Sequence, residues 1–593
     1  MSRTAARRLT LTVVISLFVY ALACYSPISW SPDGKYVAFV QFAAGEKDDD
    51  LAPEMWVVDV AADRGERIAA GRAALSAPAW SPDGAKIAYL QTDAETMPEK
   101  PDAETGMKAA LVLYNMKTKE TAKVCDTFVR VAGDKTNALA QVARLAPTWS
   151  PDGERIAFDC MEKETKPKVI MADLAGKTTV VLENAMYPQW SPDGMWIACL
   201  SEAHDPLTRL TKTGAKIVAV RADGTGKQVI ADYIPIDYHQ VNDPTYIAWA
   251  PNSRQIAFAS RVSPMEEKYG ICLADLDGKK TWLITGEKDQ EIGSPALTRD
   301  GKEAAFVRWE QNEAKDGGEF AIVAVDIMTG KDRILARIPG NGEGQVASLS
   351  WSPDGKWLAY RWQGRVIRLI AADGSQRREL TADPTSLAVL VTDEYGEMAQ
   401  KERDAGAFAE SREHAKRVVA HADDFARRFP TSHYYGNVII FKAKGLLILN
   451  RPEEAADLLD SVSFPRPNPK AEREAQFMLA ECHVALGQYR DALAIWGGLA
   501  ELYGDDPIAK QSQQRMKEIQ DALDAAQKLT EQLAKAKGPA AYLELAKVYA
   551  DVLLDPKKAT EALQGLLKDF PQSKEAAEAK EMLKKVQEKF AKE

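Results

Sequence analysis

Residues that could do chemistry are few in this chain, and their spacing matches no common catalytic motif. The sequence lacks the Gly-x-Ser-x-Gly nucleophile motif, the His-Glu-x-x-His metal motif, the phosphate-binding Gly-x-x-x-x-Gly-Lys loop and the Gly-x-Gly-x-x-Gly turn. Only six histidines are present, and just His204 and His239 precede residue 385. Two distant histidines are a poor basis for a metal site, which usually has three or four ligands. The sequence therefore predicts no catalytic residue, no metal ligand and no cofactor.

Cys24 is the one residue with an expected chemical fate. It follows three arginines and an uncharged apolar run from Leu9 to Ala23, a pattern typical of an export signal and too short for a membrane span. Ala21-Leu22-Ala23-Cys24 resembles a bacterial lipobox, in which Cys24 would be lipidated. The same residues also fit cleavage by ordinary signal peptidase, which would leave a soluble periplasmic protein. We predict a signal peptide over 1–23 and an exported protein, either periplasmic or lipid-anchored through Cys24.

Five cysteines follow Cys24, an odd number that cannot all pair, and their spacings fit no zinc pattern. Most lie in apolar strand contexts, where a buried thiol behaves as a small hydrophobic group. They are therefore expected to be structural.

Carboxylates recur at one fixed position, and this recurrence points to the elements that hold them. A Trp-Ser-Pro-Asp-Gly segment, or a variant of it, starts at Trp30, Trp80, Trp149, Trp190, Trp249, Leu297 and Trp351. Pro presets φ, Asp bonds its own backbone and Gly takes the positive φ that closes the turn. The repeat-turn residues are Trp30, Asp33, Gly34, Trp80, Asp83, Gly84, Trp149, Asp152, Gly153, Trp190, Asp193, Gly194, Trp249, Asp300, Gly301, Trp351, Asp354 and Gly355. Because these carboxylates recur at a turn, we interpret them as structural rather than catalytic.

Each turn precedes a strand pattern that is expected to bury one face, such as Lys86-Ile87-Ala88-Tyr89, and then a β-hairpin. The tandem repeats resemble those of TolB-like propellers and, more distantly, WD repeats. The resemblance covers roughly residues 26–385 and implies a β-propeller domain over 24–392. Seven turns and seven hairpins predict seven blades, whereas TolB has six and carries an N-terminal α/β domain that is not recognisable here.

Loop lengths favour one face of this propeller as a binding surface. The turns between the first and second strands of each repeat are short, and so are most turns between the third and fourth. The longer connections fall near 41–54, 91–109, 201–215, 308–319, 126–146 and 231–246. Antiparallel topology places all of these at the opposite face, and binding residues concentrate on loops of a rigid scaffold.

The remainder, residues 393–593, is expected to form an all-α domain. Helical periodicity is read near 405–428, 433–449, 453–463, 471–486, 489–503, 507–536, 539–554, 556–569 and 573–592. Three pairs resemble tetratricopeptide repeats, although in the third pair Ala559 lies one residue out of register with Tyr542 and Tyr549. The segments 429–432 and 570–573, both Phe-Pro-x-Ser, are expected to end one helix and cap the next. They resemble helical repeats of bacterial envelope proteins.

Taken together, these features predict a non-enzymatic scaffold of the bacterial cell envelope that binds protein or peptide partners. The alternative is a propeller enzyme, such as a polysaccharide or oligogalacturonate lyase, because related propellers carry a histidine-rich metal site. The net charge of −10 gives no basic field, so nucleic acid is not expected as a partner. A lipid on Cys24 would be the link to a membrane.

Overall fold

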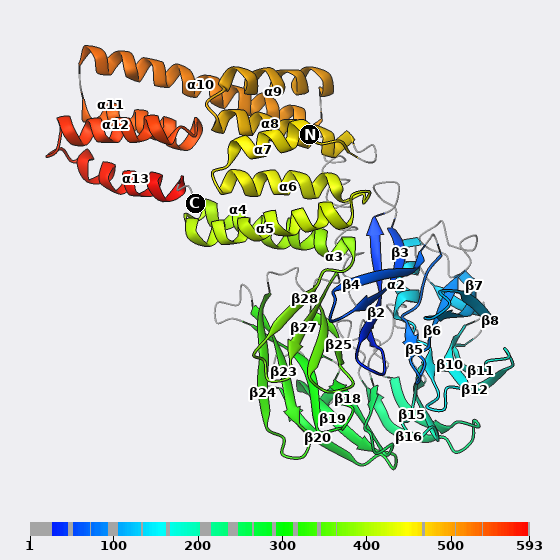
Figure 1. The fold of residues 1–593 in the computed structure, drawn as a ribbon. Helices are drawn as coiled ribbons and strands as arrows, with labels where there is room; N and C mark the ends of the chain where they lie inside the picture. Colours follow the sequence, from blue (N-terminus) through cyan, green and yellow to red (C-terminus); the bar gives the residue numbers. More distant parts are fainter. Residues whose placement is uncertain are drawn as a thin grey trace. The chain divides into compact units, whose positions relative to one another are not determined.

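The computed structural model divides the chain into two compact units, Met1–Thr385 and Ser386–Glu593, drawn as ribbons in Figure 1. It describes residues 27–590 apart from 45–50, 71–72, 93–104, 132–134, 162–165, 202–214, 235–246, 264–265, 287–291, 294, 312–317, 341–345, 363–364, 465–468, 505 and 537. The division falls seven residues before the boundary expected after residue 392. The predicted signal peptide, Cys24, His204 and His239 lie outside the described residues.

The first unit consists of seven four-stranded antiparallel sheets, each built from four consecutive strands. We number these sheets blades 1 to 7 and call their strands A to D. The first four blades comprise β1 (Ser29–Trp30), β2 (Tyr36–Ala44), β3 (Leu51–Asp59), β4 (Arg64–Ala70); β5 (Ala79–Trp80), β6 (Lys86–Thr92), β7 (Thr105–Asn115), β8 (Thr121–Val131); β9 (Thr148–Trp149), β10 (Arg155–Cys160), β11 (Lys168–Asp173), β12 (Thr178–Glu183); and β13 (Ala185–Trp190), β14 (Trp196–Ser201), β15 (Ala215–Arg221), β16 (Gln228–Ile234).

The last three blades follow the same order. They comprise β17 (Ile247–Trp249), β18 (Gln255–Ser263), β19 (Glu266–Asp275), β20 (Lys280–Thr285); β21 (Ala296–Leu297), β22 (Glu303–Gln311), β23 (Gly318–Asp326), β24 (Asp332–Gly340); and β25 (Val346–Trp351), β26 (Trp357–Trp362), β27 (Val366–Ala371), β28 (Arg377–Leu380). The predicted seven-bladed propeller is confirmed, and blade 6 is complete although Leu297 replaces the repeat tryptophan.

The B strands are buried on both faces, so the expectation of a single buried face was wrong. In β14 all six residues are buried. The cause is the propeller geometry, in which each blade is sandwiched between two neighbours, and such strands read as continuous apolar runs. An alanine stands eight residues after the start of every repeat and is fully buried: Ala38, Ala88, Ala157, Ala198, Ala257, Ala305 and Ala359. These small residues let neighbouring blades approach closely.

Side chains, not a shared strand, join blade 7 to blade 1. Blade 1 is built from the first four strands of the propeller and blade 7 from its last four, so neither blade combines strands from both ends of the propeller sequence. A hydrophobic cluster crosses the junction, with Trp30 and Phe39 from blade 1 and Leu369 from blade 7. Arg361 is fully buried, and it donates hydrogen bonds to Gln41 Oε1 and to the carbonyl oxygen of Val40, both at 3.1 Å. This arginine fastens the two ends of the ring.

The second unit is helical throughout. From the boundary onward its elements are α3 (Pro384–Val389), η2 (Leu390–Gly396), α4 (Glu397–Asp404), α5 (Phe408–Arg428), α6 (Tyr435–Ile448), α7 (Pro452–Ser461), α8 (Pro469–Ala485), α9 (Tyr489–Tyr503), α10 (Pro507–Lys535), α11 (Pro539–Lys547), η3 (Val548–Val552), α12 (Pro556–Asp569) and α13 (Glu575–Lys589). The nine predicted helices are present within a few residues of their expected bounds. The turns of α3, η2 and α4 were not anticipated.

Helix starts in this unit have local causes. Asp506 accepts a hydrogen bond from the backbone N–H of Ile508, and Asp555 accepts one from Lys558, so both carboxylates cap the following helix. The two Phe-Pro-x-Ser segments were expected to end one helix and cap the next, and Ser432 Oγ of the first segment accepts a hydrogen bond from the backbone N–H of Tyr434 at 3.3 Å. The residues at the N-caps of α6 and α13 are Tyr434 and Lys574, without a side-chain cap.

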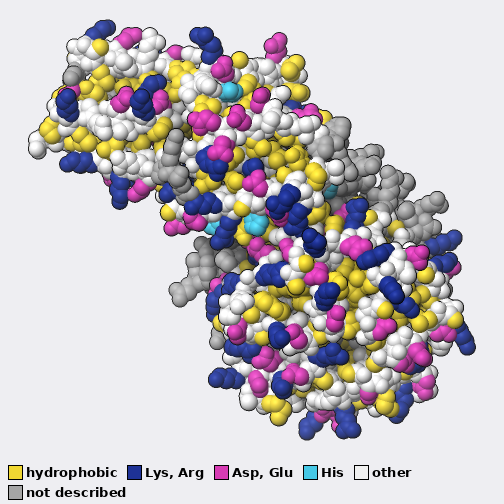
Figure 2. Space-filling view, in the orientation of Figure 1, with side chains coloured by type: hydrophobic (Ala, Val, Ile, Leu, Met, Phe, Trp, Pro, Cys, Tyr) yellow, Lys and Arg dark blue, Asp and Glu magenta, His cyan; other side chains and the backbone are white. Residues whose placement is uncertain are grey.

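Charges of both signs are interspersed over the face of the molecule drawn in Figure 2. This mixture suits a soluble surface better than one specialised for polyanions. Among the described residues, no helix is long and apolar enough to span a membrane.

Candidate interaction surfaces

The repeat carboxylates lie in the A–B turns, where each is engaged by its own turn. Asp33 Oδ1 accepts hydrogen bonds from Ser31 Oγ at 2.6 Å and from the backbone N–H of Lys35 at 3.0 Å. The corresponding bonds recur at Asp83, Asp152, Asp193 and Asp354, and at Asp300 with Thr298 in place of serine. The hydrogen bond from Ser31 holds the pKa of Asp33 below its usual value. Such committed carboxylates are poor general acids or bases.

Most of the repeat tryptophans hydrogen-bond to the blade before their own. Trp80 Nε1 donates to the carbonyl oxygen of Ser29 at 3.2 Å, and Trp30 closes the ring by donating to Ser350 at 3.1 Å. Equivalent bonds are made by Trp149, Trp249 and Trp351. The buried Nε1 of Trp190 has no partner among the described residues. Five of the seven junctions therefore carry this bond.

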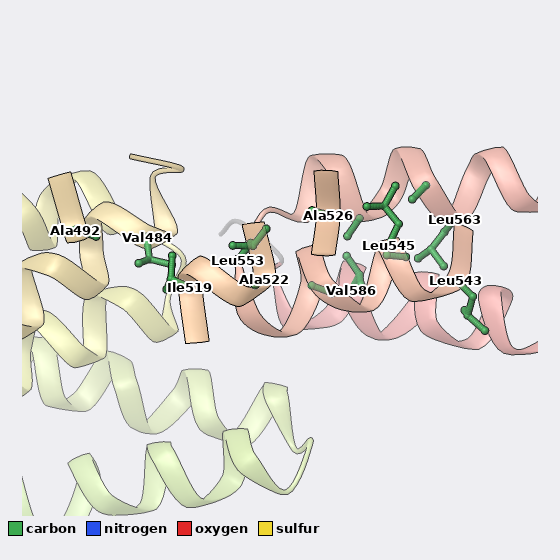
Figure 3. Packing of buried hydrophobic residues seen from close by; sticks show 14 of the residues in the cluster. Val484, Ala492, Ile519, Ala522, Ala526, Leu543, Leu545, Leu553, Leu563 and Val586 are labelled. Atoms are coloured by element: carbon green, nitrogen blue, oxygen red, sulfur yellow. The ribbon is translucent and has the colours of Figure 1, made fainter. Parts of the chain in front are cut away.

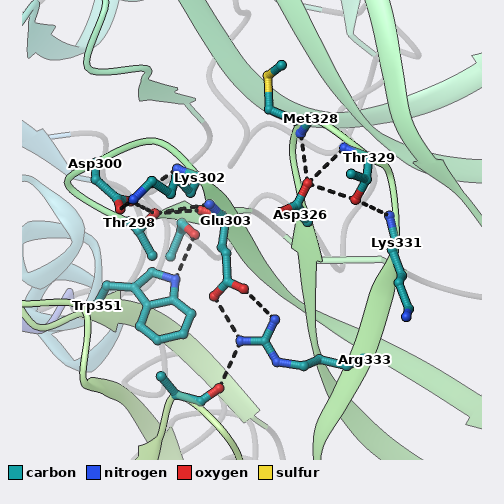
Figure 4. A network of polar contacts seen from close by, with 12 residues as sticks. Thr298, Asp300, Lys302, Glu303, Asp326, Met328, Thr329, Lys331, Arg333 and Trp351 are labelled. Atoms are coloured by element: carbon teal, nitrogen blue, oxygen red, sulfur yellow. Dashed lines mark hydrogen bonds and ion pairs between the residues drawn. The ribbon is translucent and has the colours of Figure 1, made fainter.

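The turn glycines serve the same ring. Gly84 has φ +70°, and a Cβ there would lie 3.6 Å from Cδ of Pro32 in the preceding blade. A side chain would be strained at this φ, although 3.6 Å is an ordinary contact distance. At Gly301 the space is smaller, because a Cβ would lie 2.6 Å from Cδ of Pro251 and the proline would have to move. At the junction of blades 6 and 7, Arg333 pairs with Glu303 and donates to the carbonyl oxygen of Ala372, as Figure 4 shows. These contacts join neighbouring blades on the face that carries the A–B and C–D turns, which we call the turn face.

Replacing Trp80 by phenylalanine is expected to lower the free energy of unfolding by about 1 kcal/mol more than the same change at Trp190. Both indoles are buried, but only Trp80 has a hydrogen bond to lose. Urea unfolding followed by tryptophan fluorescence measures the difference, because twelve of the 13 tryptophans lie in the propeller. Equal effects of the two substitutions would contradict the inter-blade role of the indole.

The opposite face carries the connections of variable length. All A–B turns span five residues and the C–D turns span four to six, whereas B–C connections span two to 13 residues and D–A connections one to 16. The antiparallel order places B–C and D–A connections together. Residues 202–214, which form the longest B–C connection, and 235–246, which form a D–A connection, are outside the described residues. This loop face remains the predicted binding surface of the propeller.

A helix in one D–A crossover was missed from the sequence. α2 (Lys135–Arg144) lies between β8 and β9, where only a loop was expected. Leu139 and Val142 are buried in the cluster that contains Met107 and Val129. The spacing of Leu139, Val142 and Ala143 is helical and could have revealed it. α2 gives this part of the loop face a fixed support.

In blade 6 a cluster of charged and aromatic side chains lies at the loop-face ends of β22, β23 and β24. Glu310 pairs with Arg308 at 2.6 Å and with Arg337 at 2.7 Å, and Arg337 also pairs with Glu319. Although burial opposes it, hydrogen bonds from these arginines hold the pKa of Glu310 below its usual value. Trp309 and Phe320 pack beside this network with ring centroids 4.7 Å apart. A carboxylate so fully paired can position charge but is a poor proton acceptor.

Cysteines and histidines do not gather into a reactive cluster in the described residues. Cys160, Cys199, Cys272 and Cys482 are buried free thiols. Burial raises the pKa of Cys272 to about 11 and that of Cys482 to about 12, so both stay protonated near neutrality. No group of three potential metal ligands occurs within the described ranges.

The helical unit has tetratricopeptide geometry in two segments, and Figure 3 shows part of their shared core. Ala480, Ala492 and Trp496 are buried between α8 and α9, which matches the spacing expected for such a pair. In the second segment the π-helix η3 absorbs one extra residue between α11 and α12. This explains why Ala559 lies one residue out of register while still being fully buried.

Comparison with known proteins supports this architecture. The tetratricopeptide repeat profile matches residues 474–506 and 540–573, and the profile "WD domain, G-beta repeat" matches 333–366. No curated protein matches the chain.

Several solved propellers are similar to the chain at low identity. TolB from Acinetobacter baumannii is 16% identical, with TM-score 0.34, covering 54% of this chain and 67% of its own. An oligogalacturonate lyase in complex with manganese is 14% identical, with TM-score 0.39, covering 58% and 88%. The propeller domain of the Trilobed protease from Pyrococcus furiosus is 13% identical, with TM-score 0.41, covering 60% and 95%.

The expected resemblance of the repeats to TolB-like and WD-repeat propellers is confirmed by the seven sheets and the WD match. Propellers and tetratricopeptide solenoids both present broad surfaces on rigid frames. The chain is a seven-bladed β-propeller followed by a helical domain that carries tetratricopeptide repeats.

Proposed function

We propose that this protein is a non-enzymatic interaction scaffold of the bacterial cell envelope, which binds protein or peptide partners. The single observation that carries the proposal is the union of two rigid repeat architectures, one of which matches the tetratricopeptide profile twice. Stacked helical repeats create extended surfaces for other proteins. The propeller contributes a second frame, on which the turn face is bonded into a ring and the loop face varies.

The chemistry of the described residues supports binding more than catalysis. The repeat carboxylates are held by their own turns, the thiols of Cys272 and Cys482 stay protonated near neutrality, and Glu310 is paired with two arginines. A scaffold needs only rigid elements and exposed loops, and both are present.

Affinity purification from solubilised envelopes with chemical cross-linking tests the scaffold role. We expect partner cross-links on the B–C and D–A connections of the propeller and on the helical unit. The matched control replaces Met328, whose side chain is 88% exposed in a C–D turn, by serine, and this variant should capture the same partners. Partners that cross-link only to the turn face would refute the assignment.

Mass spectrometry of the mature N-terminus tests the envelope location. We expect cleavage before Cys24 and a diacylglycerol thioether on its Sγ, which would tie the first blade closely to a membrane because Ile28 is already in the core. A mature chain with unmodified Cys24 would refute the proposed lipid anchor, and an uncleaved chain would refute the proposed export.

A further inference from the structure

In the helical unit the C-terminal ends of three helices lie close together, because the last helix returns to the beginning of the unit. The C-terminal end of α13 lies beside α4 and α5 (Figure 1). Arg412 Nη1 on α5 donates to the carbonyl oxygen of Glu588 at 2.7 Å, and Asn450 Nδ2, just past α6, donates to that of Phe590 at 3.1 Å. Arg403 Nη1, at the end of α4, donates to the carbonyl oxygen of Ile448 at 3.4 Å. The ends of α4, α6 and α13 therefore meet in one seam.

Three cations occupy this seam: Arg403, Arg412 and Lys589. None of the described residues gives Arg403 or Arg412 a carboxylate partner. Lys589 donates to the carbonyl oxygen of Ala550 at 3.0 Å, and its one carboxylate contact among the described residues is the exposed Asp551 at 3.5 Å. Yet the side chain of Lys589 is only 20% exposed. Asp404 attracts Arg403 and Glu413 is attracted by Arg412 through space, but neither carboxylate forms an ion pair with these arginines among the described residues.

Two other half-buried arginines of this unit do have carboxylate partners. Arg515 is bound through two nitrogens by Glu481 and through a third by Glu518. Arg428 pairs with Asp424 at 2.8 Å. Because a half-buried cation loses hydration, a carboxylate partner is the ordinary compensation. The seam lacks that partner in the described chain.

The helix ends alone compensate these cations only in part. The C-terminal carbonyl groups carry partial negative charge and attract cations. Among the described residues, Arg403 and Arg412 each donate one hydrogen bond to a helix-end carbonyl oxygen, whereas a guanidinium offers five donors in a planar fork that fits oxyanions. Burial lowers the pKa of Arg403 and of Lys589, and repulsion from a neighbouring cation, Arg412 and Arg403 respectively, adds to it.

We propose that Arg403, Arg412 and Lys589 form a binding site for an oxyanion, a carboxylate or phosphate group supplied by a ligand. The fork of Arg403 would hold two oxygens, while Arg412 and Lys589 supply charge from α5 and α13. Since these residues come from α4, α5 and α13, a bound oxyanion would also stabilise the packing of α13 against α4 and α5. The proposal does not depend on the scaffold function.

The test is the thermal midpoint of the full chain, followed by circular dichroism at 222 nm, to which helices contribute most. Inorganic phosphate and succinate are each compared with sodium chloride at matched ionic strength. We expect about 20 mM of at least one probe to raise the midpoint of the wild type by about 3 °C more than that of Arg403→Gln. A response to phosphate alone indicates a phosphoryl ligand, and a response to succinate alone indicates a carboxylate.

Two further variants keep the test decisive. Arg427→Gln removes an arginine whose side chain is 75% exposed and paired with Asp424, and it should respond to the probes like the wild type. Lys589→Gln replaces Arg403→Gln if the latter fails to fold. General salting effects act on all variants alike. Equal shifts in the wild type and the seam variants would overturn the site and leave the three cations as helix caps only.

Discussion

Replacing Asp159 by asparagine is expected to stabilise the propeller by about 3 kcal/mol at pH 8 and to leave its stability almost unchanged at pH 4. Asp159 lies on β10 and is 5% exposed. Its Oδ1 accepts a hydrogen bond from the backbone N–H of Tyr187 at 2.7 Å, while Oδ2 has no partner among the described residues. Burial raises the pKa of Asp159 to about 7.

The direction of the pH effect follows from that raised pKa. Between about pH 4 and pH 7 the carboxyl group is ionised in the unfolded chain but stays protonated in the folded one. As pH rises through this window, the free energy of unfolding falls by up to about 1.4 kcal/mol for each pH unit, because only the unfolded chain gains from ionisation. Asparagine keeps an oxygen for Tyr187 and does not titrate.

Asp83 provides the opposite control. The hydrogen bond from Ser81 lowers its pKa, so its ionised form stabilises the fold above the unfolded pKa and this stability is lost as pH falls. Asp83→Asn should destabilise the propeller at pH 8 and have a smaller effect at acid pH. Urea unfolding by tryptophan fluorescence at pH 4, 6 and 8 measures Asp159→Asn, and a further measurement at about pH 3, below the unfolded pKa of Asp83, measures the acid-side effect of Asp83→Asn. A stabilisation by Asp159→Asn that does not change with pH would contradict a neutral, buried carboxyl.

Replacing Arg361 by methionine is expected to destabilise the propeller by about 3 kcal/mol. Methionine fills much of the space of the aliphatic stem, but Gln41 Oε1 and the carbonyl oxygen of Val40 lose a buried donor. The loss falls at the junction of blades 7 and 1, which has no shared strand to hold it. We therefore expect the ring to open first at this junction.

Arg378 offers a matched control at the same junction. It is partly exposed, and among the described residues it makes one long hydrogen bond, 3.5 Å, to the carbonyl oxygen of Ala61. Arg378→Met should change the free energy of unfolding by less than about 0.5 kcal/mol. Hydrogen exchange of β2 and β26 should rise in Arg361→Met before exchange of blade 4 does. Uniform exchange across all blades would contradict a closure role for Arg361.

The propeller was predictable because its signal is repeated seven times in the sequence. Each turn combines Pro, Asp and Gly in an order that one backbone geometry requires, so the count did not depend on any single motif. Blade 6 shows the limit of such a motif, because Leu297 keeps its strand while the indole bond is lost. Burial of both strand faces was missed because runs such as Ile-Ala-Tyr do not reveal which neighbours will cover them.

The candidate sites were less predictable, because they depend on contacts between residues far apart in the chain. Nothing local distinguishes Arg361 from the apolar residues at its repeat position, and Asp159 occupies that same position in blade 3. The approach of Arg403 on α4 to Lys589 on α13 requires the last helix to return to the beginning of the unit. The π-helix η3 left a local signal in the sequence, namely the one-residue slip of Ala559. The sequence did not reveal, however, that a π-helix accommodates this extra residue.

The scaffold claim is tested most directly by calorimetric titration of a purified, cross-linked partner against the full chain and a loop-face variant. In the variant, Asn-Gly replaces 202–215, which joins Ser201 to Lys216 at a register they already share. We predict at least tenfold weaker binding for the variant and unchanged binding for Met328→Ser. Equal affinities for all three proteins, or chemical conversion of the partner by the wild type, would contradict the claim.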